Sequence, residues 1–460
     1  MVLKLFNTLG RAKQEFKLQK GSTVKLYTCG PTVYAYQHVG NYRTYLFEDT
    51  LKRTLLLNGF KARHIMNITD VGHLTSDADD GGDKIAKAAI RAHKTAFEIA
   101  RLYEDAFKSD LKELNILPPT KYVRATDHIK DQIKLIKTLE KKNYIYKTSD
   151  GIYFNTSKLK NYGKLAPRSI KGLRAGERVA VGEKLNPTDF ALWKFSSPSA
   201  LKRDMEWASP WGIGFPGWHI ECSAMSMRYL GSTLDIHCGG ADHIQIHHTN
   251  EIAQSEAATG KPFSKFWMHA AFLTITGEKM AKSSPETNIL VATLHERGFN
   301  PLDFRYLALG THYRKPLSFG WEALKSARTS RLKILQAYPT LPKNPQKIET
   351  SLKKKFLEAI NDDLNTSRAL AIFWQGIKQG ASEKFVLWCD HLLGLNIRNE
   401  VKNAEKEPDN ITLNIKDLLE LRETARTQKN WLEADALRQK ITRLGYSIKD
   451  TPQGPLLTKL

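Results

Sequence analysis

The stretch VKLYTCGPTVYAYQHVGN, residues 24–41, decides the fold. Its first part, residues 24–29, alternates β-branched and aromatic residues and stops at Gly-Pro, which predicts a buried strand. Residues 41–59 have apolar residues three and four apart and end at Gly59, which predicts a helix. Residues 61–68, KARHIMNI, predict the next strand. Strand, loop, helix and strand form a βαβ unit, so we expect an α/β fold built on a parallel sheet.

The downstream sequence continues this alternation with one interruption. Residues 84–115 are Ala-rich and predict one long helix, βα character returns at 233–257, and residues 268–276 predict another buried strand. Residues 144–200 differ, because they hold short strand-like pieces, many glycines and a basic run. That run indicates either an insertion that faces a phosphate backbone or a solvated loop.

Beyond about residue 320 the pattern is helical to about residue 395. Two linker-like stretches follow the sheet region, PTLPKNPQK at 339–347 and VKNAEKEPDN at 401–410. We expect the second stretch to separate a C-terminal unit of about 50 residues from the body.

The composition is that of a globular protein, because 26% of the 460 residues are charged and 41% are hydrophobic. The length predicts roughly three domains. The formal net charge of +22 favours a polyanionic partner, nucleic acid before others, with solvated lysines as the alternative. No apolar run approaches the ~20 residues of a membrane span, and the start is too short in apolar residues for a signal peptide. Four cysteines fit a reducing cytosol rather than a disulfide framework, so we expect a cytoplasmic protein.

The first motif that carries chemistry is CGPTVYAYQHVGN at 29–41, between the predicted strand and helix. Free backbone N–H groups and the helix dipole favour phosphate binding at such a helix start. His38 can donate a hydrogen bond to a phosphoryl oxygen, Gly40 allows close approach of a ring or phosphate, and Asn41 adds a neutral donor. An ordinary turn capped by Asn41 is the alternative.

The second motif, TGEKMAKSSPETN at 276–288, places Lys279 and Lys282 three residues apart in a Gly/Ser-rich loop after a strand. Phosphoryl and nucleotidyl transfer need such cations to neutralise the charge that develops on the phosphates. The motif predicts a cation clamp, and an exposed lysine turn is the alternative.

The third constellation resembles a metal site. His247 and Glu251 in IQIHHTNEIAQS are four residues apart, so on a helix they share one face. Cys29 and Cys222 each lie at a predicted strand end or strand-to-helix turn. Two thiolates, one imidazole and one carboxylate form a plausible tetrahedral zinc set. The spacing is not that of a zinc finger, so buried free cysteines beside an ion-paired His and Glu remain the alternative.

The order of these motifs, H-x-G-N near the start and K-M-x-K-S after the last strand of a basic protein, resembles class I aminoacyl-tRNA synthetases. The residues around the motifs narrow the resemblance to the cysteinyl-tRNA synthetase family, and it extends from KLFNT at 4–8 to DTPQG at 450–454. The stretches that carry it are YTCGPTVY at 27–34, NITDVGHL at 67–74, NPTDFALWK at 186–194, SPWGIGFPGWHIECSAM at 209–225, DIHCGGADH at 235–243 and HHTNEIAQS at 247–255.

The resemblance implies a zinc ion, one per subunit, in the amino-acid pocket. Its ligands would be Cys29, Cys222, His247 and Glu251. His248 would compete as a neighbour, or would support the ligands or lie at the surface. Cys238 stands where the family often has Gly, and would be a packing residue rather than a fifth ligand.

The resemblance also implies an ATP site. Its ATP-contacting residues would be His38, Gly40, Asn41, Gly240, Asp242 and Lys282, and its catalytic residues His38, Asn41, Lys279 and Lys282. Asn41 replaces the last His of the usual H-I-G-H, which keeps a donor without its charge. Ala281 replaces the first Ser of K-M-S-K-S, which removes a hydroxyl. A helix cap is the alternative role for Asp242.

Two further residue sets follow from the resemblance. The substrate pocket would be lined by Gly30, Thr32, Trp218 and His237. The anticodon would be read by Arg426, Trp431, Asp435 and Asp450. A Trp can stack on an unpaired base, while Asp and Arg can bond to base edges. The alternative is an amphipathic C-terminal helix whose Trp is part of a core.

The implied architecture is a Rossmann-like parallel-sheet catalytic domain with an insertion, then a helical bundle and a small C-terminal anticodon-binding domain. The divisions are 1–120 and 204–320 for the two halves of the catalytic domain, 121–203 for the insertion, 321–400 for the bundle and 401–460 for the C-terminal domain.

The implied reaction has two steps. The carboxylate of L-cysteine attacks the α-phosphorus of ATP and gives cysteinyl-adenylate and pyrophosphate. The terminal ribose hydroxyl of tRNA(Cys) then attacks the adenylate carbonyl. Magnesium would accompany ATP, zinc would select the thiol, and we expect a monomer that needs no membrane.

Two alternatives stay open. One is a ligase of the same fold that passes activated cysteine to a small amine, and the other is a non-catalytic RNA-binding relative. The complete-looking C-terminal domain and the net charge of +22 argue against the first. The zinc set and both lysines argue against the second.

Overall fold

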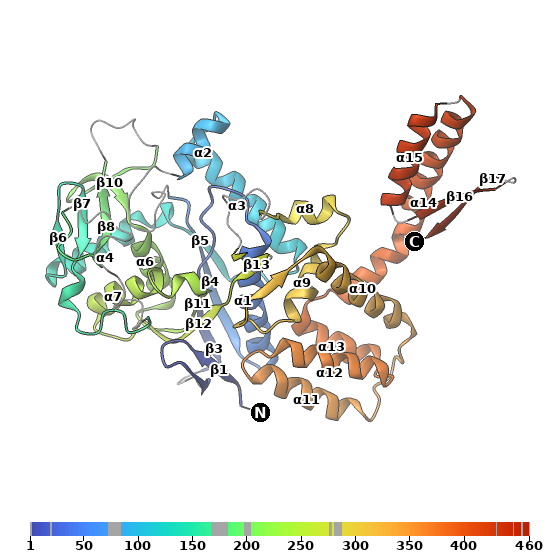
Figure 1. Cartoon of the computed structure of the whole chain (residues 1–460). Coiled ribbons are helices and arrows are strands. Elements are labelled where there is room, and N and C mark those ends of the chain that lie inside the picture. Colours follow the sequence, from blue (N-terminus) through green and yellow to red (C-terminus); the bar gives the residue numbers. More distant parts are fainter. Residues whose placement is uncertain are drawn as a thin grey trace.

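A five-stranded parallel sheet in the order β12-β11-β3-β4-β5 forms the centre of the molecule (Figure 1). Its strands are β3 (Thr23–Thr28), β4 (Lys61–Ile68), β5 (Lys121–Arg124), β11 (Leu234–Gly240) and β12 (Ser264–Ala270). The computed structural model describes residues 2–18, 21–71, 84–166, 183–196, 204–275, 278–279, 288–428, 430–444, 446–451 and 454–459. The predicted α/β fold on a parallel sheet is confirmed.

Helices cover both faces of this sheet. Helix α1 (Val39–Leu57) lies on one face, and α6 (Trp218–Leu230) and α7 (His247–Thr259) lie toward the other. Because side chains alternate along a strand, Val24 and Leu26 of β3 pack on the α1 side. Tyr27 and Cys29 pack instead among residues of α6 and α7. Because of this alternation, the side chain of Cys29 lies on the side of the sheet that α6 and α7 cover.

Strands from the predicted insertion (121–203) and from residues 207–216 form a second, antiparallel sheet in the order β6-β7-β8-β10-β9, whereas β5, at the start of the predicted insertion, belongs to the central sheet. The strands of the antiparallel sheet are β6 (Ile145–Lys147), β7 (Gly151–Phe154), β8 (Phe190–Phe195), β9 (Trp207–Ser209) and β10 (Gly212–Pro216), and α4 (Ile129–Lys141) precedes them. The division we expected at residue 203 falls inside this sheet, because Gly214 of β10 pairs with Phe195 of β8.

Three local predictions are wrong, and the first two concern residues 84–115 and 268–276. The single helix expected at 84–115 is two helices, α2 (Lys84–Ala92) and α3 (Ala96–Glu113). Thr95 starts α3 through a capping box: its hydroxyl accepts a hydrogen bond from the Glu98 N–H at 3.2 Å, and Glu98 Oε2 accepts one from the Thr95 N–H at 2.8 Å.

The strand expected at 268–276 is also split. Strand β12 ends at Ala270, and the Ala271 N–H donates to the Tyr313 carbonyl oxygen at 2.8 Å instead of to a sheet neighbour. Residues further on form β13 (Leu273–Ile275), which joins β14 (Glu278–Lys279) and β15 (Leu317–Phe319) in a separate small sheet.

The chain is helical from Trp321 to Leu393 apart from short connections, as predicted for about 320–395, and two further helices precede this part. The helices are α8 (Val291–Glu296), α9 (Pro301–Leu309), α10 (Trp321–Ala337), α11 (Glu349–Asn361), α12 (Thr366–Lys378) and α13 (Glu383–Leu393). Residues 341–348 connect α10 and its terminal 3₁₀ turn to α11 without regular structure, in agreement with the linker expected at 339–347. The linker expected at 401–410 is wrong, because these residues lie within one long helix, α14 (Ile397–Thr427).

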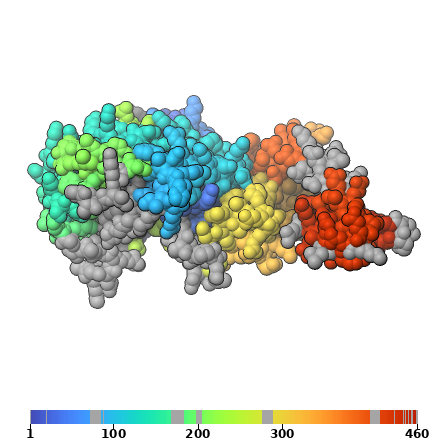
Figure 2. All heavy atoms as spheres, turned by 90° about the horizontal axis from the view of Figure 1, so that it is seen from above, coloured from blue at the N-terminus to red at the C-terminus, as the bar shows by residue number. Residues whose placement is uncertain are grey.

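The C-terminal unit is built on the far part of α14. Helix α15 (Trp431–Arg443) and the hairpin of β16 (Tyr446–Thr451) and β17 (Gly454–Lys459) complete it. A small core joins these elements through Ile415, Leu418, Ile441 and Ile448. Seen from two directions, this unit and the insertion lie at opposite ends of the molecule (Figures 1 and 2). A hairpin of β1 (Lys4–Asn7) and β2 (Ala12–Glu15) lies near the N-terminus.

Among the described residues, no helix combines the length and the apolar character that crossing a membrane requires.

Candidate active site

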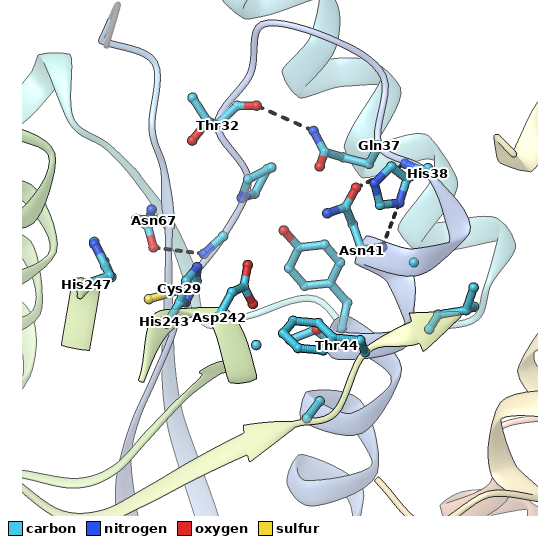
Figure 3. Close-up of a pocket in the computed structure, with 18 of the residues that line it drawn as sticks. Cys29, Thr32, Gln37, His38, Asn41, Thr44, Asn67, Asp242, His243 and His247 are labelled. Carbon is cyan, nitrogen blue, oxygen red and sulfur yellow. Dashed lines mark hydrogen bonds between the residues drawn. The ribbon is translucent and has the colours of Figure 1, made fainter. Parts of the chain in front are cut away.

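A pocket of about 260 Å³ opens where β3 and β11 end and α1 begins (Figure 3). In open parallel sheets, ligands bind at this carboxyl edge of the strands. The residues predicted from the sequence that line the pocket are Cys29, Gly30, Thr32, His38, Gly40, Asn41, Trp218, Cys222, Gly240, Asp242 and His247. Two of the three constellations, although far apart in sequence, thus meet at one cavity.

His38 and Asn41 hold each other at the start of α1. His38 is the N-cap, and its Nδ1 accepts a hydrogen bond from the Asn41 N–H at 3.1 Å. The Asn41 side-chain oxygen accepts one from the His38 N–H at 3.2 Å (Figure 3). Gly40 lies in the same turn, so an anion here would meet the positive end of the helix dipole. Asn41 is therefore both the capping residue of the alternative hypothesis and part of the pocket wall.

Gly30 sits where any larger residue would collide with the neighbouring strand β4. A Cβ at Gly30 would lie 1.8 Å from the Asn67 carbonyl oxygen, which is backbone and cannot turn away. The Gly30 N–H donates to Asn67 Oδ1 at 2.8 Å, and Asn67 Nδ2 donates to Thr69 Oγ1 at 3.0 Å. Asn67 thus fixes the backbone of the pocket wall beside Cys29.

The four predicted zinc ligands come together. Cys29 follows β3, Cys222 lies on α6, and His247 and Glu251 lie one turn apart on α7. One ligand atom from each lies within 4.8 Å of the others, and all four residues are buried. Glu251 Oε1 is 3.0 Å from His247 Nε2 but accepts no hydrogen bond within the described part of the chain. Two thiols, an imidazole and an orphaned carboxylate oxygen are the donor set that zinc prefers, so these residues fit the ion.

The protonation states of these groups are strongly perturbed. Burial raises the pKa of the Cys29 thiol, whereas a hydrogen bond from Cys29 lowers the pKa of Cys222 to about 7. Burial alone would lower the pKa of His247, but Glu251 and Cys222 raise it to about 10. Burial alone would raise the pKa of Glu251, but His237 and His247 lower it to about 2. The surroundings therefore favour the ionised form of the Glu251 carboxylate and make the Cys222 thiol easy to ionise, even before a metal ion binds.

A second group of potential ligands overlaps the first. Cys29 and Glu251 also lie within 4.8 Å of ligand atoms of His237 and His248. Zinc favours the first set, because it has two sulfur donors. Cys29, Cys222 and His247 also line the pocket, whereas His237 and His248 do not. An ion in the first set would face the cavity that a substrate enters.

Three residues around this set differ in role. The expectation that His237 lines the pocket is wrong, because it lies behind the ligands, with Nε2 3.0 Å from Glu251 Oε2 and its ring stacked on Trp267. His248 is fully buried rather than at the surface, with Nε2 3.3 Å from Cys29 Sγ. Cys238 points to the opposite face of the sheet and packs near α1, so it is a core residue.

The lysine motif is described only in part. Lys279 lies in β14, where its backbone pairs with Thr274. Ala281 and Lys282 fall outside the described residues. Their roles remain predictions.

Sequence reasoning missed several pocket residues, namely Gln37, Thr44, Asn67 and His243. Figure 3 shows them around the cavity, with Gln37 donating to the Thr32 carbonyl oxygen at 3.4 Å. His243 lies with its ring 5.1 Å from that of His247 and 6.0 Å from that of Trp218. Asn67 and His243 fall in the stretches NITDVGHL and DIHCGGADH, but no spacing rule singles them out.

Two of the predicted anticodon residues, Arg426 and Asp450, contact each other, and the other two, Trp431 and Asp435, lie in the first turns of α15. Trp431 is 59% exposed and Asp435 is exposed, so both are accessible to a base. Arg426 donates to Asp450 at 3.0 Å, and the buried Arg422 donates to both oxygens of Asp450 at 2.9 Å. Asp450 is therefore oriented by two arginines, which hold its pKa below the usual range.

Comparison with known families covers most of the chain. A model of the "tRNA synthetases class I (C) catalytic domain" matches residues 15–329. A model of the "Cysteinyl-tRNA ligase anticodon binding domain" matches residues 409–454, in the C-terminal unit.

Curated relatives match over almost their whole length. Cysteine–tRNA ligase 1 of Burkholderia lata is 46% identical over 99% of this chain and 97% of the relative. Cysteine–tRNA ligase of Treponema denticola is 40% identical over 98% of both chains. In fold, the chain is similar to Mycobacterium tuberculosis methionyl-tRNA synthetase in complex with methionyl-adenylate, with a TM-score of 0.58, 16% identity and coverage of 83% of this chain and 89% of that one. The chain belongs to the cysteine–tRNA ligase family of class I aminoacyl-tRNA synthetases.

Proposed function

We propose that this chain uses ATP to join L-cysteine to tRNA(Cys), and that the amino acid is activated in the pocket of Figure 3. One observation carries this proposal: the thiol- and imidazole-bearing wall and the His38–Asn41 helix start line the same cavity. The side chain of a bound cysteine would contact the wall that carries Cys29, Cys222 and His247. Its carboxylate would then be directed toward a phosphate bound at the start of α1, beside His38 and Asn41. That juxtaposition is what attack on the α-phosphorus requires.

Cys29, Cys222, His247 and Glu251 would hold one zinc ion, which would supply a Lewis acid that prefers a thiolate to a hydroxyl. Serine differs from cysteine by one atom, and a pocket of the right shape alone would exclude it poorly. Trp218, whose ring lies 4.3 Å from that of His247, closes the wall beside the set and limits the size of the side chain that enters.

His38, Gly40 and Asn41 would bind the phosphates of ATP at the start of α1, while Gly240 and Asp242 would face the adenosine. Lys279 and Lys282 would neutralise the negative charge that builds up on the phosphates as pyrophosphate leaves. None of these side chains needs to become covalent, because the reaction gains its rate from proximity and charge stabilisation. Magnesium would enter with ATP on the phosphate oxygens.

The tRNA would span from the pocket to the C-terminal unit. Trp431 would stack on an unpaired base, and Arg426, Asp435 and Asp450 would bond to base edges. The net charge of +22 suits this polyanionic partner. The four cysteines are all free thiols and buried, which fits a protein that works in the reducing cytoplasm, and we propose that it does so as a monomer.

Two assays test this function. Cysteine-dependent exchange of pyrophosphate into ATP measures the first step, and charging of a tRNA(Cys) transcript measures the second. We expect both activities with L-cysteine and neither with L-serine at equal concentration. Exchange without charging would favour a ligase that passes cysteine to a small amine. The absence of exchange in zinc-loaded protein would favour a non-catalytic RNA-binding relative.

A further inference from the structure

A buried ion-pair network holds the first turn of α14 against the body of the protein. Arg331 of α10 donates through Nε to Asp303 Oδ1 of α9 at 2.7 Å and through Nη1 to Glu400 Oε2 of α14 at 3.0 Å. The side chain of Arg331 is 4% exposed and that of Asp303 is 0% exposed. One buried guanidinium therefore joins three helices, while the side chain of Glu400 is 18% exposed.

The carboxylates of this network are held from further directions. Asn300, the N-cap of α9, donates from Nδ2 to Glu400 Oε2 at 3.1 Å, while its Oδ1 accepts from the Leu302 N–H at 2.8 Å. Asp303 Oδ2 accepts from the Asn300 N–H at 3.0 Å. The side chains of Asn300 and Asp303 thus both cap α9 and take part in the network that holds α14. This arrangement leaves the first turn of α14 little freedom to rotate.

The same short helix, α9, is bound on its other side to the helix of the ATP site. Arg305 of α9 donates to Asp49 of α1 at 2.5 Å and to the carbonyl oxygen of Leu393 at 2.6 Å. Both side chains are buried. Asp303 and Arg305 therefore connect α9 to the root of the C-terminal unit and to the helix that begins at His38.

We infer that Arg331 is a positioning residue for tRNA, which fixes through Asp303 and Glu400 the direction in which α14 carries the C-terminal unit away from the pocket. Buried ion pairs contribute little net stability, because the loss of hydration offsets the attraction, but they hold one geometry when every partner is satisfied. Arg331 contacts neither the pocket nor the anticodon residues, so its effect reaches tRNA only through α14. The inference rests on the proposed reading of the anticodon by that unit.

The test compares two RNA substrates with the full-length protein. In Arg331→Met, which keeps the length of the side chain but not its charge, we expect the KM for a tRNA(Cys) transcript to rise roughly tenfold, because a misdirected C-terminal unit lowers the effective concentration of the second contact. Charging of a minihelix that contains only the acceptor and T arms should stay within about twofold of wild type, as should cysteine-dependent exchange. The KM of Arg331→Lys for the tRNA(Cys) transcript should lie between those of wild type and Arg331→Met. A lysine ammonium can pair with one carboxylate, but it lacks the planar guanidinium that binds two carboxylates at once.

A matched control and a second measurement keep the inference falsifiable. Arg368→Met, at an exposed position of α12, removes the same charge without touching α14 and should change no parameter. Small-angle X-ray scattering should show a changed or broader distance distribution for Arg331→Met but not for Arg368→Met.

The outcomes separate this inference from the proposed function. An unchanged tRNA KM in Arg331→Met, or an equal loss on the minihelix, would overturn the positioning role while leaving the function intact. A wild-type protein that charges neither RNA would instead refute the proposed function. If Arg331→Met lowers the thermal midpoint strongly, the same comparison is made with Glu400→Gln, which removes the charge on the α14 side alone.

Discussion

At the scale of single residues, the face of a strand decides what a cysteine or histidine can do. Cys29 and Cys238 are both buried thiols at the centre of the sheet, yet only Cys29 lies on the α6–α7 side. His237 lies on that side too, but behind Glu251 rather than in the pocket wall. Alternation along two neighbouring strands thus assigns one cysteine to the candidate metal set and the other to the core.

Cobalt substituted for zinc should report contact between the metal and the substrate. Adding L-cysteine is expected to intensify the sulfur-to-cobalt charge-transfer absorption, and adding L-serine is not, because a hydroxyl is a poor match for the ion. Cys222→Ser should weaken metal binding, while Cys238→Ser serves as the control and should leave the spectrum unchanged. No spectral response to saturating cysteine would mean that the metal does not touch the substrate.

Lys282→Ala should slow adenylate formation far more than it weakens cysteine binding. A cation placed where transition-state charge develops is worth roughly 10²–10³ in rate. The measurement is cysteine-dependent pyrophosphate exchange, with cysteine affinity taken from the cobalt spectrum. An exchange rate within about threefold of wild type would contradict the assignment, because a phosphate-binding cation cannot be that dispensable.

The residues of the candidate site differ in how far the sequence could predict them. The spacing of His247 and Glu251 indicates one helical face, and that part follows from elementary geometry. Cys29 and Cys222 are 193 positions apart, so no local pattern pairs them: residue chemistry left the set as one of two hypotheses, and the resemblance to a family favoured it. The resemblance also placed His237 in the pocket wall, because a motif records which residues recur and not which of them lie behind their neighbours.

At the scale of elements, sequence patterns with one clear period predicted the bounds of helices and strands well. Continuous apolar or polar runs did not predict where an element ends. The strand expected at 61–68 is β4, because its ends are marked by turn residues. The apolar run around Ala271 hides the end of β12, which is set by a tertiary hydrogen bond to Tyr313 that no local pattern contains. The polar residues 401–410 suggested a linker, but their backbone continues a helix whose two ends are packed.

The contact between α1 and α3 should depend on pH. Tyr42 of α1 donates a hydrogen bond to Asp110 of α3 at 2.6 Å, and burial raises the pKa of Asp110 from 3.8 to about 6. The folded protein therefore binds a proton that the unfolded chain releases near pH 4, so this group's contribution to stability is full below that pH and is lost as pH rises toward 6.

Urea unfolding of wild type and Asp110→Asn between pH 4.5 and 7 measures this effect. Because the variant cannot ionise, its stability relative to wild type should rise with pH over this range and then level off. A difference that is independent of pH would show that Asp110 has the same pKa in both states. Taking the difference between the two proteins cancels any effect of acid on a metal bound at the proposed site, because that effect would be the same in both.

At the scale of the whole molecule, the pocket and the predicted anticodon residues belong to separately packed parts (Figures 1 and 2). Removing the chain after Asn403 keeps the first turns of α14, including Glu400, on the body. We expect cysteine-dependent exchange to remain nearly intact in this truncation, while tRNA charging falls strongly because the second contact with tRNA is gone. Trp431→Ala in the full-length chain should also lower tRNA charging, but by less than the truncation does. A truncated protein that charges tRNA with unchanged KM would disprove anticodon reading by this unit.

The order of the central sheet has a consequence for how the protein is made. Strand β3 sits in the middle of the sheet, yet its partner β11 begins about 200 residues later in the chain. At a synthesis rate of about 5–20 residues per second, β3 emerges from the ribosome roughly 10–40 s before that partner exists. During this interval one edge of β3 is unpaired, and Cys29 lacks the other three members of its set, Cys222, His247 and Glu251, which follow in that order. If these residues hold zinc as proposed, the complete set exists only after more than half of the chain has been translated, and binding of the metal would be a late event in synthesis.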